Sequence, residues 1–115
     1  QRTNRKSELV DEARGFVSEH LSDPNLGQQL VADHLGLSAG HLGKVFRDET
    51  HESLTDYING RRVDEAKSLL ATTDLPVNEI CDRVGMRNHS YFFTLFKRVA
   101  RTTPARYRRS TRSGT

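Results

Sequence analysis

Apolar residues recur at helical spacing along most of the chain, and turn-forming residues separate the segments. The spacing predicts a first helix that runs from Ser7, as its N-cap, to Leu21. A short helix is expected over about 28–35, and Gly36 stops it, because a left-handed backbone conformation favours glycine. A longer helix follows over about 54–71.

One more helix is predicted inside the stretch GLSAGHLGKVF, residues 36–46. Its opposite face carries Gly40 and Gly43 and few long side chains, which is unusual for a helix that binds a partner. Glycine either lets the backbone approach a partner closely or weakens the helix until the partner orders it. The apolar residues at i, i+3 and i+4 are Leu42, Val45 and Phe46.

The same kind of pattern starts again in the second half. Residues 77–84 predict a short helix, Gly85 a turn, and residues 89–99 a helix with its last valine buried. Thr103, followed by proline, starts a last short helix through Tyr107. No segment alternates with period two for long enough to be a strand, so we expect an all-α fold of about seven helices.

Composition limits the class of protein. A chain of 115 residues with 34% hydrophobic residues forms one domain or two very small ones, with no deep enclosed pocket. No apolar run is long enough for a membrane span, and no signal peptide is present. The single cysteine, Cys81, excludes an internal disulfide and fits a reducing compartment. Since the chain begins at Gln1 and its only methionine is Met86, we expect it to be a fragment of a longer protein.

Charge is segregated along the chain. Residues 85–115 hold eight Lys and Arg and no acid, whereas residues 1–84 hold ten bases against fifteen acids. A basic end on a slightly acidic body indicates a polyanionic partner, nucleic acid first and an anionic membrane second. From Arg108 onward, the alternative is a solvated, disordered arginine-rich tail.

An internal repeat joins the two halves. The motif Val31-Ala32-x-x-Leu35-Gly36-Leu37 aligns with Ile80-Cys81-x-x-Val84-Gly85-Met86 at an offset of 49 residues. The helices that follow align at an offset of 50 residues. A small residue where two helices cross, a glycine at the turn and apolar anchors are what a helix-turn-helix requires. Two such units at matched spacing are far stronger evidence for a helix-turn-helix fold than a single unit would be.

Four further motifs, read together, carry a family resemblance. They are Ala66-Lys67-x-Leu69-Leu70, Val77-x-x-Ile80-x-x-x-Val84-Gly85, Ser90-Tyr91-Phe92-x-x-x-Phe96-Lys97 and Thr103-Pro104-x-x-Tyr107-Arg108. Over about residues 8–109 the chain resembles the DNA-binding domain of AraC/XylS-type bacterial transcription regulators. It departs from the family pattern at His51 and Arg101, where glycine is usual, and at Met86, where an aromatic residue is usual.

The resemblance implies two helix-turn-helix subdomains joined by a long linker helix, a homeodomain-like pair. Their expected ranges are 1–52 for the first subdomain, 53–72 for the linker, 73–109 for the second subdomain and 110–115 for a flexible tail. A linker helix of about 18 residues spans roughly 27 Å, whereas successive major grooves lie about 34 Å apart. If the linker is stiff, straight DNA has to bend, at a cost of a few kcal/mol by order of magnitude.

The resemblance also implies sequence-specific binding of double-stranded DNA by a cytoplasmic bacterial activator that sets one recognition helix in each of two successive major grooves. An N-terminal effector-sensing or dimerising domain is then expected outside this sequence, and RNA polymerase is the candidate second partner. The alternative function is a protein-interaction module that docks on RNA polymerase or a regulatory partner. For that role the acidic first helix is the candidate surface, through Glu8, Asp11, Glu12 and Glu19.

In the second unit, Asn88 is the expected N-cap of the recognition helix. The face opposite its apolar residues carries groups that bind base edges or phosphate. Phe93 either contacts a thymine methyl or packs under the last helix near Tyr107, and His89 either faces the groove or starts the helix in solvent. The DNA-binding candidates of this unit are Asn88, His89, Ser90, Phe93, Thr94 and Lys97.

In the first unit, Lys44 is the main candidate for a base contact, and Arg47 for a phosphate contact. The candidates of this unit are Ala39, Gly40, Gly43, Lys44 and Arg47. We therefore expect the second unit to carry more of the base discrimination.

Structural roles are expected for three other residues. His41 lies at the edge of the buried face, Arg62 resembles a fold-supporting arginine of the family, and Cys81 occupies the small helix-crossing position as an inert thiol. The five histidines have no zinc-site spacing and the sequence has no phosphate-binding loop, so no metal, cofactor or enzyme activity is expected.

Overall fold

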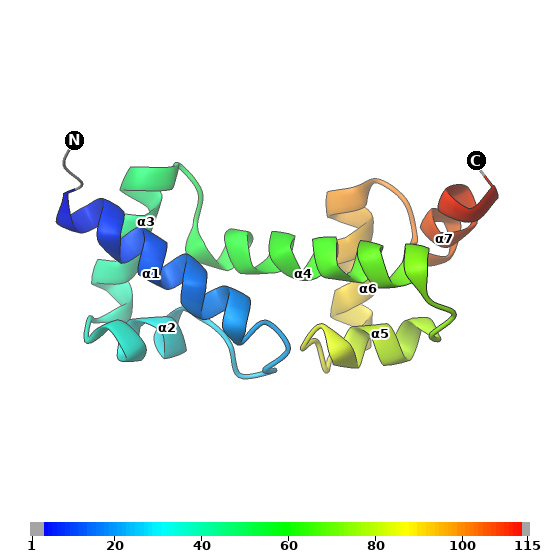
Figure 1. Ribbon diagram of the computed structural model, residues 1–115, viewed down its shortest axis with the longest axis horizontal. Helices are drawn as coiled ribbons and strands as arrows, with labels where there is room; N and C mark the ends of the chain where they lie inside the picture. The colour runs from blue at the N-terminus through cyan, green and yellow to red at the C-terminus, as the bar shows by residue number, and fades with distance from the viewer. Residues whose placement is uncertain (1–3, 114–115) are drawn as a thin grey trace. The chain divides into compact units, whose positions relative to one another are not determined.

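The computed structural model describes residues 4–113, which form seven α-helices and no strand (Figure 1). The prediction of an all-α fold is confirmed. The chain divides into two compact units, residues 1–58 and 59–115. The helices are α1 (Arg5–Glu19), α2 (Gln28–Leu35), α3 (Ala39–Thr50), α4 (Leu54–Thr72), α5 (Val77–Arg83), α6 (His89–Ala100) and α7 (Pro104–Ser113).

The first unit is built on α1, which packs against both α2 and α3 (Figure 1). The apolar stripe of α1 points inward because its members recur three and four residues apart. The N-terminal part of α4 adds Leu54 and Ile58 to the same core. The buried residues of this core are Leu9, Val10, Ala13, Val17, Leu26, Val31, Ala32, Leu42, Val45, Phe46, Leu54 and Ile58.

The second unit is built on the rest of α4, against which α5 and α6 bury their apolar faces. Tyr107 of α7 packs edge-on against Phe96, with ring centroids 5.9 Å apart. The helix runs through Gly60 without a break, so α4 gives apolar residues to both cores. The buried residues of the second core are Val63, Ala66, Leu70, Ile80, Cys81, Val84, Met86, Phe92, Leu95 and Phe96.

The repeat seen in the sequence is a repeat of backbone geometry. Gly36 and Gly85 both adopt the left-handed conformation, with φ of 73° and 84°. In each unit the residue after this glycine donates its N–H to the carbonyl of the small residue at the helix crossing. Leu37 N donates to Ala32 O over 2.9 Å, and Met86 N donates to Cys81 O over 2.9 Å. These bonds satisfy carbonyls at the ends of α2 and α5 and set the direction in which the chain leaves each helix.

The first helix begins earlier than the sequence predicted. Asn4, not Ser7, is the N-cap of α1, and its side chain accepts a hydrogen bond from Ser7 N over 2.8 Å. Asparagine is as good an N-cap as serine, and the extra turn lets Arg5 pair with Glu8 and Glu12. Ser7 therefore lies inside the first turn.

Two other expectations about the second unit are wrong. Val99 is 43% exposed rather than buried, and Ala100 packs against the second core in the last turn of α6. Helix α7 continues to Ser113, so residues 110–113 are helical where a flexible tail was expected. The last two residues of that tail lie outside the described residues.

Arg62 is a buried charged residue of the fold, only 7% exposed. Among the described residues, no buried side-chain nitrogen or oxygen lacks a hydrogen-bond partner. A buried guanidinium in such a setting supports the fold through internal polar contacts. This is the structural role that the sequence suggested for it.

Two arginines of α7 bind the C-terminal end of α4. Arg108 donates from Nε to Leu70 O over 3.1 Å and from Nη2 to Thr73 O over 3.0 Å. Arg112 also donates to Thr73 O, and its Nη1 lies 2.5 Å from Asp74 Oδ1. The last carbonyls of a helix lack internal partners and carry partial negative charge, so cations are favourable there. Two of the eight basic residues at the end of the chain thus hold the fold together, and α7 is not a disordered tail.

We predict that Arg108→Ala destabilises the protein by about 2 kcal/mol, because it removes charged donors from two helix-end carbonyls. The matched control is Arg106→Ala on the same helix, whose side chain is exposed and which should change stability by less than about 0.5 kcal/mol. Urea denaturation followed by circular dichroism measures both. Equal stability of the two variants would show that the carbonyl contacts contribute nothing.

The Arg112 pair makes part of the stability depend on pH. The hydrogen bond and the charge of Arg112 lower the pKa of Asp74 below its ordinary 3.8. A carboxyl whose pKa falls on folding stabilises the folded state above its unfolded pKa, and this stabilisation is lost as the pH falls through the lower, folded value. We expect Asp74→Asn to reduce stability at pH 7 and to flatten its decline on the acid side. Thermal melts from pH 7 to pH 2 test this, and identical acid limbs would contradict it.

Candidate nucleic-acid interface

Helix α3 presents an open face formed by short and basic side chains. Ser38 caps the helix by accepting a hydrogen bond from His41 N over 3.1 Å, which fixes where α3 begins. Gly40, Lys44 and Arg47 are exposed on the side opposite the buried residues. His41 was expected to pack at the edge of the buried face, but its side chain is exposed, and only its backbone has a structural role.

The two glycines of α3 differ in their surroundings. A Cβ on Gly43 would lie 2.7 Å from Nε2 of Gln28, which crosses α3 there and donates to Ala39 O over 2.7 Å. A Cβ on Gly40 would meet nothing within 4 Å. Gly43 therefore makes room for a contact between α2 and α3, whereas Gly40 leaves an open, bare stretch of backbone. Of the sequence candidates in this unit, Ala39 and Gly43 lie at the Gln28 contact.

Lys44 already has a partner on its own helix. Its Nζ lies 3.2 Å from Asp48 Oδ2, one helical turn away, and the lysine side chain is 76% exposed. Exposed pairs of this kind contribute a few tenths of a kcal/mol, so a competing anion displaces the carboxylate at little cost. Sequence reasoning did not include Asp48, although the spacing of i and i+4 on one helix face is a readable signal.

Helix α6 presents a more varied surface. The side chain of Asn88 caps the helix by accepting a hydrogen bond from Tyr91 N over 3.0 Å, as expected. Ser90, Thr94 and Lys97 are exposed on the face away from the core. These side chains offer hydroxyl donors and acceptors and one cation along a single row of the helix.

His89 is held by a residue of the preceding helix. Its Nε2 lies 2.9 Å from Asp82 Oδ1, and the histidine side chain is 34% exposed. The carboxylate fixes the orientation of the ring and leaves Nδ1 for another partner. Asp82 was missed because nothing in the local pattern of α5 relates it to a residue across the turn. The equivalent Asp33 of the first unit accepts instead from Gln29 Nε2 of its own helix.

Phe93 is an apolar side chain on this polar surface. It is 40% exposed, and its ring contacts Phe92 edge-on with centroids 5.8 Å apart. The alternative in which it packs near Tyr107 is wrong, because Phe96 occupies that position. A single exposed apolar side chain is normal on a protein surface, so this exposure shows only that the Phe93 ring is accessible to a partner.

The part of the chain that the structure describes contains neither a metal-binding cluster nor a reactive thiol. No group of three or more His, Cys, Asp or Glu residues there is placed to hold a metal ion. Burial raises the pKa of the Cys81 thiol to about 11, so it stays protonated and unreactive at neutral pH. No helix of the described residues is both long and apolar enough to cross a membrane.

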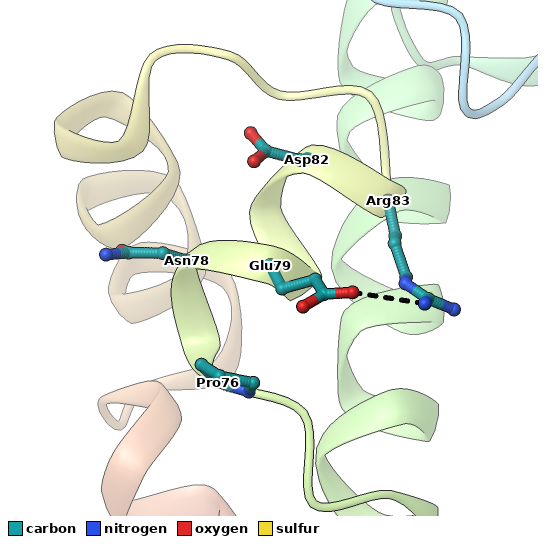
Figure 2. A pocket seen from close by; sticks show the side chains of 5 residues that line it. All are labelled: Pro76, Asn78, Glu79, Asp82 and Arg83. Carbon is teal, nitrogen blue, oxygen red and sulfur yellow. Dashed lines mark hydrogen bonds and ion pairs between the residues drawn. The ribbon is translucent and has the colours of Figure 1, made fainter.

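A depression of about 600 Å³ lies along α5 and is shown in Figure 2. It is lined by Pro76, Asn78, Glu79, Asp82 and Arg83, all from α5 and the residue before it. Glu79 and Arg83 pair with each other over 3.1 Å. Figure 2 marks this pair with a dashed line and shows Asn78 and Asp82 pointing elsewhere. Small-molecule sites are usually enclosed, largely apolar pockets with converging polar groups, so this depression does not resemble one.

Comparison with known proteins adds independent evidence. A family profile described as "Helix-turn-helix domain" matches residues 31–110. The Arabinose operon regulatory protein of Escherichia coli (strain K12) is 33% identical over 99 residues, which are 86% of this chain but 34% of that protein. The chain thus spans about a third of that relative. Regulatory protein SoxS of the same organism is 33% identical over 100 residues, which cover 87% of this chain and 92% of SoxS.

Solved structures show the same fold. The C-terminal domain of AraT, a response regulator from Geobacillus stearothermophilus, superposes with a TM-score of 0.88 and 34% identity, covering 93% of this chain and 88% of that one. The DNA-binding domain of AdpA, a global transcriptional factor solved in complex with a target DNA, gives a TM-score of 0.84 and 27% identity, covering 90% and 93%.

The difference between the glycines of α3 predicts unequal gains in stability on substitution by alanine. Gly40→Ala should raise the free energy of unfolding by roughly 0.5–1 kcal/mol, since its Cβ meets open space. Gly43→Ala should gain less, because it displaces Gln28 from Ala39 O. In a Gln28→Ala background the two substitutions should become equivalent. Urea denaturation of the five variants measures this, and a full gain from Gly43→Ala in the wild-type background would contradict it.

Proposed function

This chain belongs to the AraC/XylS family of helix-turn-helix transcription regulators, and we propose that it binds double-stranded DNA sequence-specifically, with one recognition helix in each of two successive major grooves. The observation that carries the proposal is the duplicated unit, in which a left-handed glycine turn presents α3 and α6 with their polar faces uncovered. The AdpA domain, solved with a target DNA, supports it by similarity of fold and sequence.

Helix α3 contributes proximity and charge. The bare backbone at Gly40 lets the start of the helix approach the base edges, as expected for the N-terminal part of a recognition helix. Lys44 leaves Asp48 to donate to a guanine, and Arg47 binds a phosphate. Ala39 and Gly43 act through the Gln28 contact, which sets the position of α3 on α2.

Helix α6 contributes most of the base discrimination. Ser90 and Thr94 hydrogen-bond base edges, Phe93 contacts a thymine methyl, and Lys97 binds a phosphate. His89 uses the ring nitrogen that Asp82 leaves available, so Asp82 acts as a positioning residue. Asn88 has its side chain engaged in capping and fixes the start of the helix.

The experiment that tests the proposal is selection of bound duplexes from a random pool, followed by fluorescence anisotropy with the selected and a scrambled duplex at several salt concentrations. A site of two short blocks about one helical turn apart, with a preference of at least about a thousandfold, is the expected result. Equal, salt-sensitive binding to both duplexes would reduce the function to non-specific attraction.

The alternative function, docking on RNA polymerase or another protein, involves a different face. The acidic side chains of α1 proposed for it, Glu8, Asp11, Glu12 and Glu19, are exposed. If α1 serves only as a protein-docking surface, charge reversal at Asp11 and Glu19 should leave the affinity for DNA unchanged or raise it. Pull-down of RNA polymerase in the presence of the selected duplex separates the two roles.

Gly40→Ala is predicted to separate DNA affinity from stability. The variant should be more stable than the wild type, yet bind the selected duplex about tenfold more weakly, the effect of losing roughly 1.4 kcal/mol of contact. Gly15→Ala in α1 is the matched control, since a Cβ there also meets nothing within 4 Å. It should gain stability with unchanged affinity. Thermal melts and anisotropy titration measure the two quantities, and equal affinities for both variants would exclude close approach at Gly40.

The ranking of the two helices gives a second prediction. Each lost base contact reduces discrimination by about 1–3 kcal/mol. We expect the double variant Thr94→Ala/His89→Ala to lose more base preference in the block that α6 contacts than Lys44→Ala loses in the block that α3 contacts. Repeating the duplex selection with each variant measures the change, and the reverse order would place the main readout on α3.

A further inference from the structure

The residues that follow the two recognition helices adopt an unusual backbone conformation. His51 and Arg101 are the C-caps of α3 and α6, and both have a φ of 64°, in the left-handed region. They occupy equivalent positions, 50 residues apart, in the two units. Among the described residues, the other positive-φ positions are Gly36 and Gly85, both glycines.

Glycine adopts the left-handed conformation without steric cost, whereas in a residue with a Cβ the same conformation is sterically unfavourable. The chain therefore uses glycine at the turn inside each unit but keeps a large nitrogen-bearing side chain at the equally left-handed turn after each recognition helix. A side chain retained against a backbone preference, twice at equivalent positions, indicates that the side chain itself has a role.

The two residues come directly after the rows of proposed DNA contacts. The N–H of His51 donates to Arg47 O over 2.8 Å, and that of Arg101 donates to Lys97 O over 2.9 Å, so each residue closes the last turn of its helix. Arg101 follows Thr94 and Lys97 by seven and four residues, so its backbone lies at the C-terminal end of their row. Both side chains are exposed, and within residues 4–113 neither makes a side-chain hydrogen bond or ion pair.

Helix length places this end of the row near the DNA backbone. Each recognition helix has 12 residues and is about 18 Å long, longer than the width of a major groove, which is about 12 Å. When the N-terminal turns contact bases, the C-terminal end leaves the groove and meets its edge, which phosphates line. A guanidinium or an imidazole N–H at that point is a suitable phosphate donor.

We propose that Arg101 and His51 each bind a DNA phosphate at the edge of the groove that their helix enters. This inference rests on the proposed function, since it requires α3 and α6 to be the recognition helices. The contribution of Arg101 is the larger one. Near His51 the chain carries Asp48, Glu49 and Glu52, whereas α6 has no acidic residue and places Arg98 beside the row.

A different role has to be separated from this one. A basic side chain at the C-terminus of a helix also stabilises the negative end of the helix dipole. If that were the reason for Arg101, its removal would destabilise the fold whether or not DNA is present. Substitutions that tolerate the left-handed conformation distinguish the two roles, because they remove the side chain without straining the turn.

The experiment compares Arg101→Asn, Arg101→Gly and Arg101→Lys with the wild type, and His51→Asn for the first unit. Lys6→Ala, which removes one exposed charge at the start of α1, reports the effect of net charge alone. Thermal melts measure stability, and anisotropy with the selected duplex at five salt concentrations measures affinity and its salt dependence. Repeated duplex selection with Arg101→Asn measures base preference.

The expected result for Arg101→Asn and Arg101→Gly is an unchanged or raised melting temperature and about five- to tenfold weaker binding. The slope of log affinity against log salt should become shallower by about 0.9, with base preference unchanged. Arg101→Lys should restore the slope, and His51→Asn should show a smaller loss.

Three results would overturn the inference. A lower melting temperature of Arg101→Gly with unchanged affinity would make Arg101 a helix cap. An altered base preference would make it a base-reading residue, and a salt slope no different from that of Lys6→Ala would remove the specific contact. Failure of the proposed function is separate, because it appears as equal binding of the selected and scrambled duplexes by the wild type.

Discussion

The arrangement of both units depends on one backbone turn that occurs twice. A left-handed glycine lets the next residue donate to the carbonyl of Ala32 or Cys81, five residues back, and both of these small side chains are fully buried at the helix crossing. A larger residue there would push the two helices apart, and a residue with a Cβ at Gly36 or Gly85 would be strained. The exit direction of the chain, and hence the presentation of α3 and α6, follows from this geometry.

Groups on the proposed binding face have internal partners before any DNA is present. Asp48 holds Lys44, Asp82 holds His89, and the Asn88 side chain holds the start of α6. These partners have different effects. An exposed lysine pair gives way to a stronger anion, whereas an imidazole fixed by a carboxylate keeps one ring nitrogen in a defined orientation. The face is therefore partly ordered in advance, which lowers the entropic cost of binding.

Net charge overstates how many bases are available to a polyanion. Arg108 and Arg112 bind the carbonyl end of α4, so part of the basic end of the chain stabilises the packing of α7 on the second unit. The bases that remain exposed include Arg87, Lys97 and Arg101. Segregation of charge along a sequence thus indicates the kind of partner, but it does not separate the cations that bind it from those that support the fold.

The sequence by itself determined the order of the helices, the left-handed turn at Gly36, most of the buried faces and the family, but not the start of α1, the end of α7 or the exposure of Val99. These depend on short-range information: the 3.6-residue period of apolar positions, the freedom of glycine and the N-cap Asn88. It also located the open face of α6, because that face lies opposite a strongly apolar one. Such features are encoded within a few residues of where they act.

Only the tertiary structure decided which side chains meet across segments. It placed Gln28 over Gly43, Asp82 beside His89 and the arginines of α7 on the end of α4, and it left Phe93 exposed because Phe96 packs on Tyr107. In the sequence the two glycines of α3 are indistinguishable, yet one lies under a side chain of another helix and one faces open space. A local sequence pattern specifies the backbone and the buried side of a helix. The partner of a surface side chain depends instead on the distance between helices, and only the packing of the helices sets that distance.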